Sequence, residues 1–92
     1  MIQALILINT ERGSVTQTAQ NLLKIQGIYE VFSVTGEYDL VAMARVKEYE
    51  DLASVVTENV AKVSTITRTT TMLAYKVYSR EDIEESFHIG VE

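Results

Sequence analysis

The chain has 92 residues, of which 47% are hydrophobic and 23% charged, and its formal net charge is -5. This length holds one domain, and this composition is typical of a folded globular protein rather than a disordered one. The sequence has no cysteine, which excludes disulfides, thiol nucleophiles and thiolate metal sites. Its acidic balance, without a cluster of Lys and Arg, argues against direct binding of nucleic acid.

The apolar stretches are short. The longest run, Ala4 to Ile8, is far too short to span a bilayer. The first residues lack the basic stretch, the long apolar core and the small-residue cleavage site of a signal peptide. We therefore expect a cytoplasmic protein with no membrane contact.

The first part of the chain predicts a strand, a helix and a second strand. Residues 2–8 are apolar at nearly every position, which is typical of a strand buried on both faces. Ser14 and Gln17 match a capping box, so a helix is expected to begin there and to end near Gly27. Residues 28–35 alternate as a strand. Its faces are predicted to carry Ile28, Glu30, Phe32 and Val34 on one side and Tyr29, Val31, Ser33 and Thr35 on the other.

The second part predicts a hairpin, a helix and a last strand. Gly36 gives the backbone freedom for a turn, and residues 40–46 return as a strand. Acidic residues then favour a helix start because they complement its macrodipole. β-formers mark residues 64–78 as the last strand. The second helix is predicted to bury Leu52, Val55, Val56, Val60 and Val63.

The resulting order, β-α-β-β-α-β, predicts an α+β, ferredoxin-like fold: a four-stranded antiparallel sheet with both helices on one face. The other face should then be polar, yet the first and third strands are apolar on both faces. In the first strand, one face carries Ile2, Ala4, Ile6 and Ile8 and the other Leu5 and Leu7; in the third, one face carries Leu40, Ala42 and Ala44 and the other Val41 and Met43. A soluble monomer rarely exposes so large an apolar patch. We therefore expect a homodimer formed through the open face of the sheet.

The remaining residues carry little evidence of chemistry. Residues 79–92 form an acidic tail, in which Ile83 and Phe87 are spaced for a short helix. His88 is the only histidine, and it lacks the neighbours that a general base or a metal site requires. The four glycines are isolated, so no phosphate-binding loop is present. We expect no catalytic residue, no metal and no cofactor.

The acidic turn and the threonine run suggest a small-ligand site. Taken alone, Gly36 and Asp39 need do no more than form a hairpin, and threonine is a good strand former. However, Thr67, Thr69 and Thr71 are expected on one face at period two, as a row of hydroxyls. Together with exposed amides, these groups suit the carboxylate of an amino acid, whereas Asp39 suits its ammonium group.

These residues resemble the ligand-binding domain, also called the RAM domain, of the Lrp/AsnC (feast/famine) transcriptional regulators. The carriers are Val34-Thr35-Gly36-Glu37-Tyr38-Asp39-Leu40 and the run Ile66-Thr67-Arg68-Thr69-Thr70-Thr71-Met72, with an amphipathic helix between them. The resemblance covers residues 1–78. It departs from full-length regulators in that no helix-turn-helix domain precedes the first strand.

The resemblance implies dimers that assemble into octameric or decameric rings, with an amino-acid effector between dimers. It also implies a stand-alone module that senses amino acids or co-assembles with a full-length Lrp/AsnC paralogue. Arg12 is a further candidate that could reach in from a neighbouring subunit. Carried over by position, the effector-binding residues are Gly36, Tyr38, Asp39, Thr69 and Thr71, with Thr67 a weaker candidate.

Two alternatives remain open. One is a small enzyme of the dimeric α+β barrel type, for which Tyr29, Tyr75 and Arg45 are the available acid–base candidates near the sheet. The other is an oligomerisation module that binds no ligand. A ligand between dimers would favour the sensor, and a ligand inside one protomer would favour the enzyme.

Overall fold

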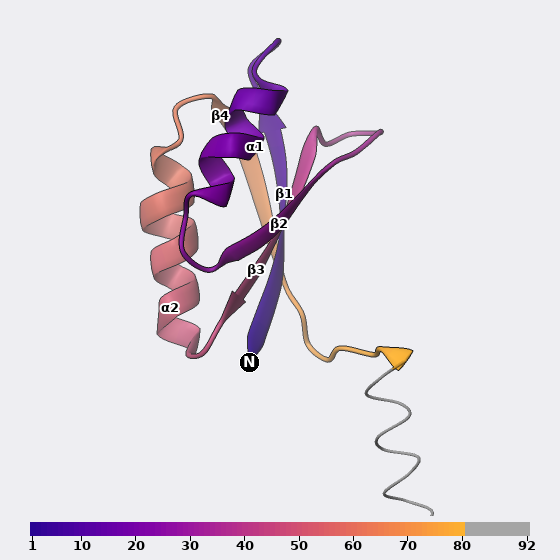
Figure 1. The fold of residues 1–92 in the computed structure, drawn as a ribbon, viewed down its shortest axis with the longest axis vertical. Helices are drawn as coiled ribbons and strands as arrows, with labels where there is room; N and C mark the ends of the chain where they lie inside the picture. Colours follow the sequence, from indigo (N-terminus) through magenta and orange to yellow (C-terminus); the bar gives the residue numbers. More distant parts are fainter. Residues whose placement is uncertain (81–92) are drawn as a thin grey trace, which may run out of the picture.

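A computed structural model, which describes residues 1–80, has the predicted order of elements (Figure 1). The sheet order is β2-β3-β1-β4, and every neighbouring pair is antiparallel. Both helices cover the same face of the sheet (Figure 1), so the ferredoxin-like fold is confirmed. The elements are β1 (Ile2–Thr10), α1 (Val15–Leu23), β2 (Ile28–Ser33), β3 (Leu40–Val46), α2 (Tyr49–Ala53) and β4 (Ile66–Leu73); α2 continues through a π-helical segment, Ser54–Asn59, and a 3-10 turn, Val60–Lys62.

The core lies between the helices and the two central strands, β1 and β3. Alternate residues of these strands face the helices, and the register pairs Ile6 with Ala42 and Ile8 with Leu40. Burying one large aliphatic side chain contributes about 1.5–3 kcal/mol, so this layer dominates the stability. The helices contribute Leu22, Leu52, Val55 and Val60, all buried.

One buried polar residue, Thr18, links α1 by a hydrogen bond to the segment that leads into β4. Thr18 is 0% exposed, and its hydroxyl donates to the carbonyl of Ser14 at 2.6 Å. The same hydroxyl lies within hydrogen-bond distance of the Thr65 hydroxyl. Because a hydroxyl has a single proton, Thr65 must be the donor in that second bond. The buried oxygen is thereby fully satisfied.

The predicted capping box at the start of α1 is wrong. Ser14 is the N-cap residue, but its side chain makes no capping hydrogen bond because its backbone, at ψ 11°, is not extended. A box forms at the second helix instead, where the Glu48 N–H donates to the Asp51 carboxylate at 3.2 Å. Helix α1 also ends at Leu23, well before Gly27.

The predicted faces of the second strand are also wrong, because β2 contains a β-bulge. Ile28 pairs with Ala44 but Glu30 pairs with Met43, so Tyr29 is an extra residue in the register. Beyond the bulge the alternation is reversed. Phe32 therefore lies on the open face rather than beside Ile28.

The last strand is shorter than predicted. Strand β4 ends at Leu73, and the next residue still donates its N–H to the carbonyl of Gln3 at 2.8 Å. Strand β1 begins at Ile2, which the register places opposite Tyr75, so residues 76–78 lie beyond the end of their partner strand. Their β-propensity alone cannot form a strand.

The proposed tail helix and His88 lie outside the described residues. Within residues 1–80, no helix is both long and apolar enough to cross a bilayer.

Candidate functional site

The turn between β2 and β3 is held against the end of β1 by backbone and side-chain hydrogen bonds. The Asp39 N–H donates to the carbonyl of Ile8 at 2.9 Å. In return, one oxygen of the Asp39 carboxylate accepts the Thr10 N–H at 2.8 Å. The Asn9 amide donates to the carbonyl of Glu37 at 2.7 Å. The turn is thus positioned by β1 rather than by its own sequence alone.

The Asp39 carboxylate therefore has a structural task as well as a charge. Its second oxygen has no hydrogen-bond partner among residues 1–80. The side chain is half-buried at the end of the sheet. This arrangement leaves one charged oxygen, held in place by the bond of the other, available to a cation such as an ammonium group.

Gly36 stands at the exposed tip of the turn. Its φ of +107° is in the region that glycine adopts readily and other residues do not. A Cβ built at this position would meet no heavy atom within 4 Å. The protomer therefore leaves open space beside the turn.

The strand register separates the candidate threonines from the turn. Thr69 pairs with Ile8 and Thr71 with Ile6, so both hydroxyls lie on the helix-covered face of β4. Thr67 falls at a bulge, since the register shifts between Asn9 and Thr10. The expected row of three hydroxyls is thus reduced to Thr69 and Thr71. Both are exposed on an edge strand, and neither has a hydrogen-bond partner within residues 1–80.

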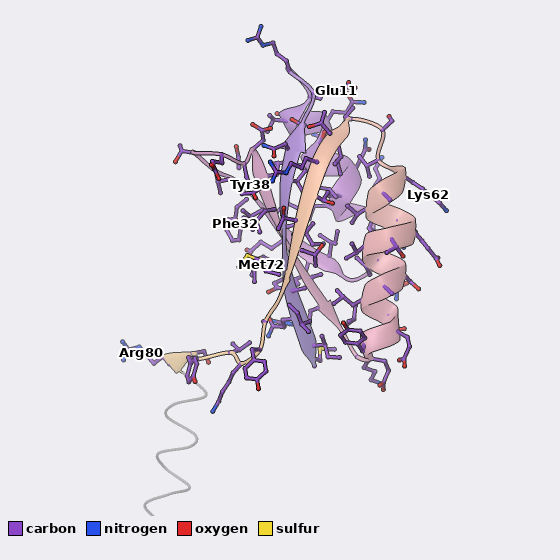
Figure 2. The ribbon with its side chains drawn as sticks, turned by 180° about the vertical axis from the view of Figure 1, so that it is seen from behind. Glu11, Phe32, Tyr38, Lys62, Met72 and Arg80 are labelled. Carbon is purple, nitrogen blue, oxygen red and sulfur yellow. The ribbon has the colours of Figure 1, made fainter. Side chains whose placement is uncertain are left out.

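The β4 threonine that contacts the turn is instead Thr70. It pairs with Leu7 on the open face, and the Tyr38 hydroxyl donates to its Oγ1 at 3.4 Å. Figure 2 shows Tyr38, Phe32 and Met72 on the side of the sheet away from the helices. The roles of Thr70, Asn9 and Thr10 were not predicted from the sequence. The sequence offered an indication only for Thr70, which lies two residues before apolar Met72, so that both side chains point to the open face.

The open face of the sheet is apolar at its centre and polar at its ends. Phe32 and Met72 are 45% and 54% exposed there. At the end far from the turn, the Arg45 guanidinium lies 4.5 Å from the centre of the Tyr29 ring. Such a cation–π pair holds both side chains over the sheet. The apolar centre also includes Leu5, Leu7, Val41 and Met43, all half-buried.

The candidate enzyme residues lie in two separate places. Tyr29 stacks on Arg45 and donates to the Gln3 side chain at 3.3 Å, whereas Tyr75 is fully exposed beyond β4. Arg12 is exposed in the turn after β1. Within residues 1–80, no group of three acidic, His or Cys side chains is placed to hold a metal.

A cavity of about 480 Å³ opens at the opposite end of the molecule from the turn. It lies between the loop before β2, the end of β3 and the second helical segment, and none of the candidate effector residues lines it. Its walls include Gln26, Gly27, Arg45, Lys47, Asp51 and Asn59.

The model of the Lrp/AsnC ligand binding domain matches residues 3–83. The chain belongs to this family. A curated relative, the HTH-type transcriptional regulator FL11 of Pyrococcus abyssi, is 35% identical over 75 residues, which cover 82% of this chain and 49% of the relative. FL11 of Pyrococcus furiosus is also 35% identical, over 84% of this chain and 50% of its own length. The chain thus spans about half the length of these curated relatives.

Several solved structures share the same fold. TTHA0845 from Thermus thermophilus is 39% identical with a TM-score of 0.81, and the match covers 87% of this chain and 100% of that one. FFRP-DM1 is 34% identical with a TM-score of 0.76, over 80% and 99% of the two chains. The feast or famine regulatory protein of Mycobacterium tuberculosis, complexed with L-methionine, is 21% identical with a TM-score of 0.71 over 87% and 54%, a likeness of fold alone.

Proposed function

We propose that this Lrp/AsnC domain is an effector-binding assembly module, which binds an α-amino acid where copies of the chain meet. The observation that carries the proposal is the turn at residues 34–39: it is fixed by hydrogen bonds on its inner side and open on its outer side. A rigid site with one open wall is completed when a neighbouring subunit supplies that wall.

The polar groups at this site match a zwitterion. The free oxygen of Asp39 would accept the ammonium group. The hydroxyls of Tyr38 and Thr70, which lie within hydrogen-bond distance of each other, are further polar groups next to the turn. Thr69 and Thr71 point to the other face, along the exposed edge of β4. They would therefore contact an effector bound at the turn of a neighbouring subunit, across the interface between the two. The methionine bound to the Mycobacterium tuberculosis protein supports an amino acid as the ligand class.

The apolar open face supports assembly as the second half of this function. We propose that two sheets pack face to face as a homodimer and that dimers join into a ring of eight or ten chains. A ligand that binds only at an assembled interface must stabilise the assembly by the same free energy. Amino-acid concentration would then control the oligomeric state.

The curated relatives are named as HTH-type transcriptional regulators. An effect of this chain on transcription would follow if it enters mixed assemblies with a full-length regulator of the same family. The paralogue, rather than this domain, would then contact DNA.

A thermal-shift screen against the twenty amino acids tests the effector site. A ligand at about 100 times its dissociation constant adds roughly 2.7 kcal/mol to the stability of the native state, which raises the unfolding midpoint visibly. We expect a selective shift that is lost in Asp39→Asn. This variant removes the charge but keeps an oxygen to accept the Thr10 N–H, so its own fold should persist.

Glu37→Gln is the matched control. It removes a charge from the same turn, and the Glu37 side chain has no hydrogen-bond partner within residues 1–80. It should keep the shift. A shift retained in Asp39→Asn would contradict the role of Asp39, and no shift with any amino acid would contradict the effector function.

A further inference from the structure

Three exposed apolar side chains lie close together after β4, in a segment that we call the arm (residues 75–80). Tyr75 is 103% exposed, Tyr78 is 74% exposed and Val77 is 44% exposed. Exposed aromatic side chains so close together are uncommon on a soluble monomer and mark interaction surfaces. The exposed side chains of Tyr75, Val77 and Tyr78 are therefore candidates for a contact with another molecule.

The arm projects on the same side of the sheet as the open face. In Figure 1 it runs away from the sheet on the side opposite the helices, and the reverse view in Figure 2 agrees. Its starting point is fixed, because the Ala74 N–H donates to the carbonyl of Gln3 on β1. The arm thus leaves from the end of the open face where Arg45 stacks on Tyr29.

We propose that the arm packs against the partner sheet in the face-to-face dimer and fastens the two copies together. This proposal rests on the dimer proposed above. Packed sheets lie about 10 Å apart, whereas six extended residues reach about 20 Å. An arm that leaves on the side of the open face is therefore long enough to cross the interface and lie along the partner.

The charge and the local structure of the arm are also compatible with packing against a second copy of the chain. The Lys76 ammonium lies 5.3 Å from the centre of the Tyr78 ring, so the charge is held beside an aromatic face instead of opposing burial. The arm would extend an apolar interface whose centre is Phe32 and Met72. A second copy of this chain offers that complementary surface next to the arm.

Removal of the aromatic side chains tests the arm. In the full chain, Tyr75→Ser with Tyr78→Ser should raise the dimer dissociation constant at least tenfold, as measured by sedimentation equilibrium. Tyr49→Ser is the matched control, because Tyr49 is 62% exposed on α2, across the molecule from the open face. An unchanged constant in the double variant would overturn the proposal while the dimer itself stands.

Cross-linking gives a readout that does not depend on affinity. The chain has no cysteine, so Tyr78→Cys labelled with benzophenone maleimide carries a single photoprobe. Irradiation should yield covalent dimers, whereas Tyr49→Cys labelled in the same way should not. Cross-links confined to one chain would overturn the arm proposal. A wild-type protein that is monomeric at micromolar concentration would overturn the dimer, and the arm with it.

Discussion

At the scale of single residues, two glycines share a backbone conformation but differ in their surroundings. Gly27 has φ +104° and Gly36 has φ +107°. A Cβ at Gly27 would lie 2.8 Å from Cγ2 of Val55 and 3.3 Å from Cγ1 of Val46. At Gly36 the same atom would meet only open space. Backbone strain is thus common to both positions, whereas crowding is confined to one.

Alanine substitutions at these two positions distinguish the cost of backbone strain from the cost of crowding. Gly36→Ala should destabilise the protein by about 1–3 kcal/mol, the cost of holding alanine at this φ. Gly27→Ala should cost about 1–3 kcal/mol more, because the methyl group also overpacks the contact between the loop and α2. Urea unfolding at one protein concentration measures both values. Equal losses would contradict the crowding seen at Gly27.

At the scale of elements, most of the fold follows from local pattern. The apolar stripe on the second helix predicts its buried residues Leu52, Val55 and Val60, because burial repeats with the period of the helix, whereas Val56 and Val63 are only half-buried. The errors about which face a strand residue occupies arise at bulges. Tyr29 and Thr67 shift the register of their strands, and a bulge depends on the partner strand, which the local sequence does not contain.

The same limit explains what was missed at the candidate site. The turn is readable because Gly36 and Asp39 are local signals. The contact from Tyr38 to Thr70 joins residues far apart in sequence and depends on how β4 aligns with β1. Without that alignment the choice between Thr70 and its neighbours Thr69 and Thr71 cannot be made.

The two helix starts make a second prediction at this scale. Asp51→Ala should destabilise the protein by about 1 kcal/mol, since it removes the acceptor of the Glu48 N–H. Ser14→Ala should change stability by less than about 0.5 kcal/mol, because the Ser14 side chain caps nothing. Thermal unfolding of the two variants compares them directly. The reverse order would mean that the cap lies at α1 after all.

At the scale of the whole molecule, the helices within residues 1–80 cover one side of the sheet and leave the other side open. The helices bury one face of the sheet, and the half-buried side chains of the other face include Leu5 and Met43, which pair across β1 and β3. Dimerisation through this face would add to the stability of each protomer. The unfolding midpoint should then rise with protein concentration, as mass action requires.

A charge at the centre of this face tests the dimer. Met43→Glu should yield monomers in sedimentation analysis, because packing would bury a carboxylate without a partner. Leu23→Glu is the control: Leu23 is 51% exposed on α1, on the helix side. It should remain at least a dimer. A dimeric Met43→Glu would show that the subunits associate through another surface.

The short strand β4 connects the candidate effector site to the arm. Its Thr70 receives the hydroxyl of Tyr38, and the arm begins two residues beyond its last residue, Leu73. Both points are tied to β1, Thr70 by its pairing with Leu7 and the residue before the arm by the bond from the Ala74 N–H to the carbonyl of Gln3. Only the last residues of β4 separate Thr70 from the arm. If an amino acid displaces Tyr38, the proposed contact between the arm and the partner subunit should therefore respond to what occupies the turn.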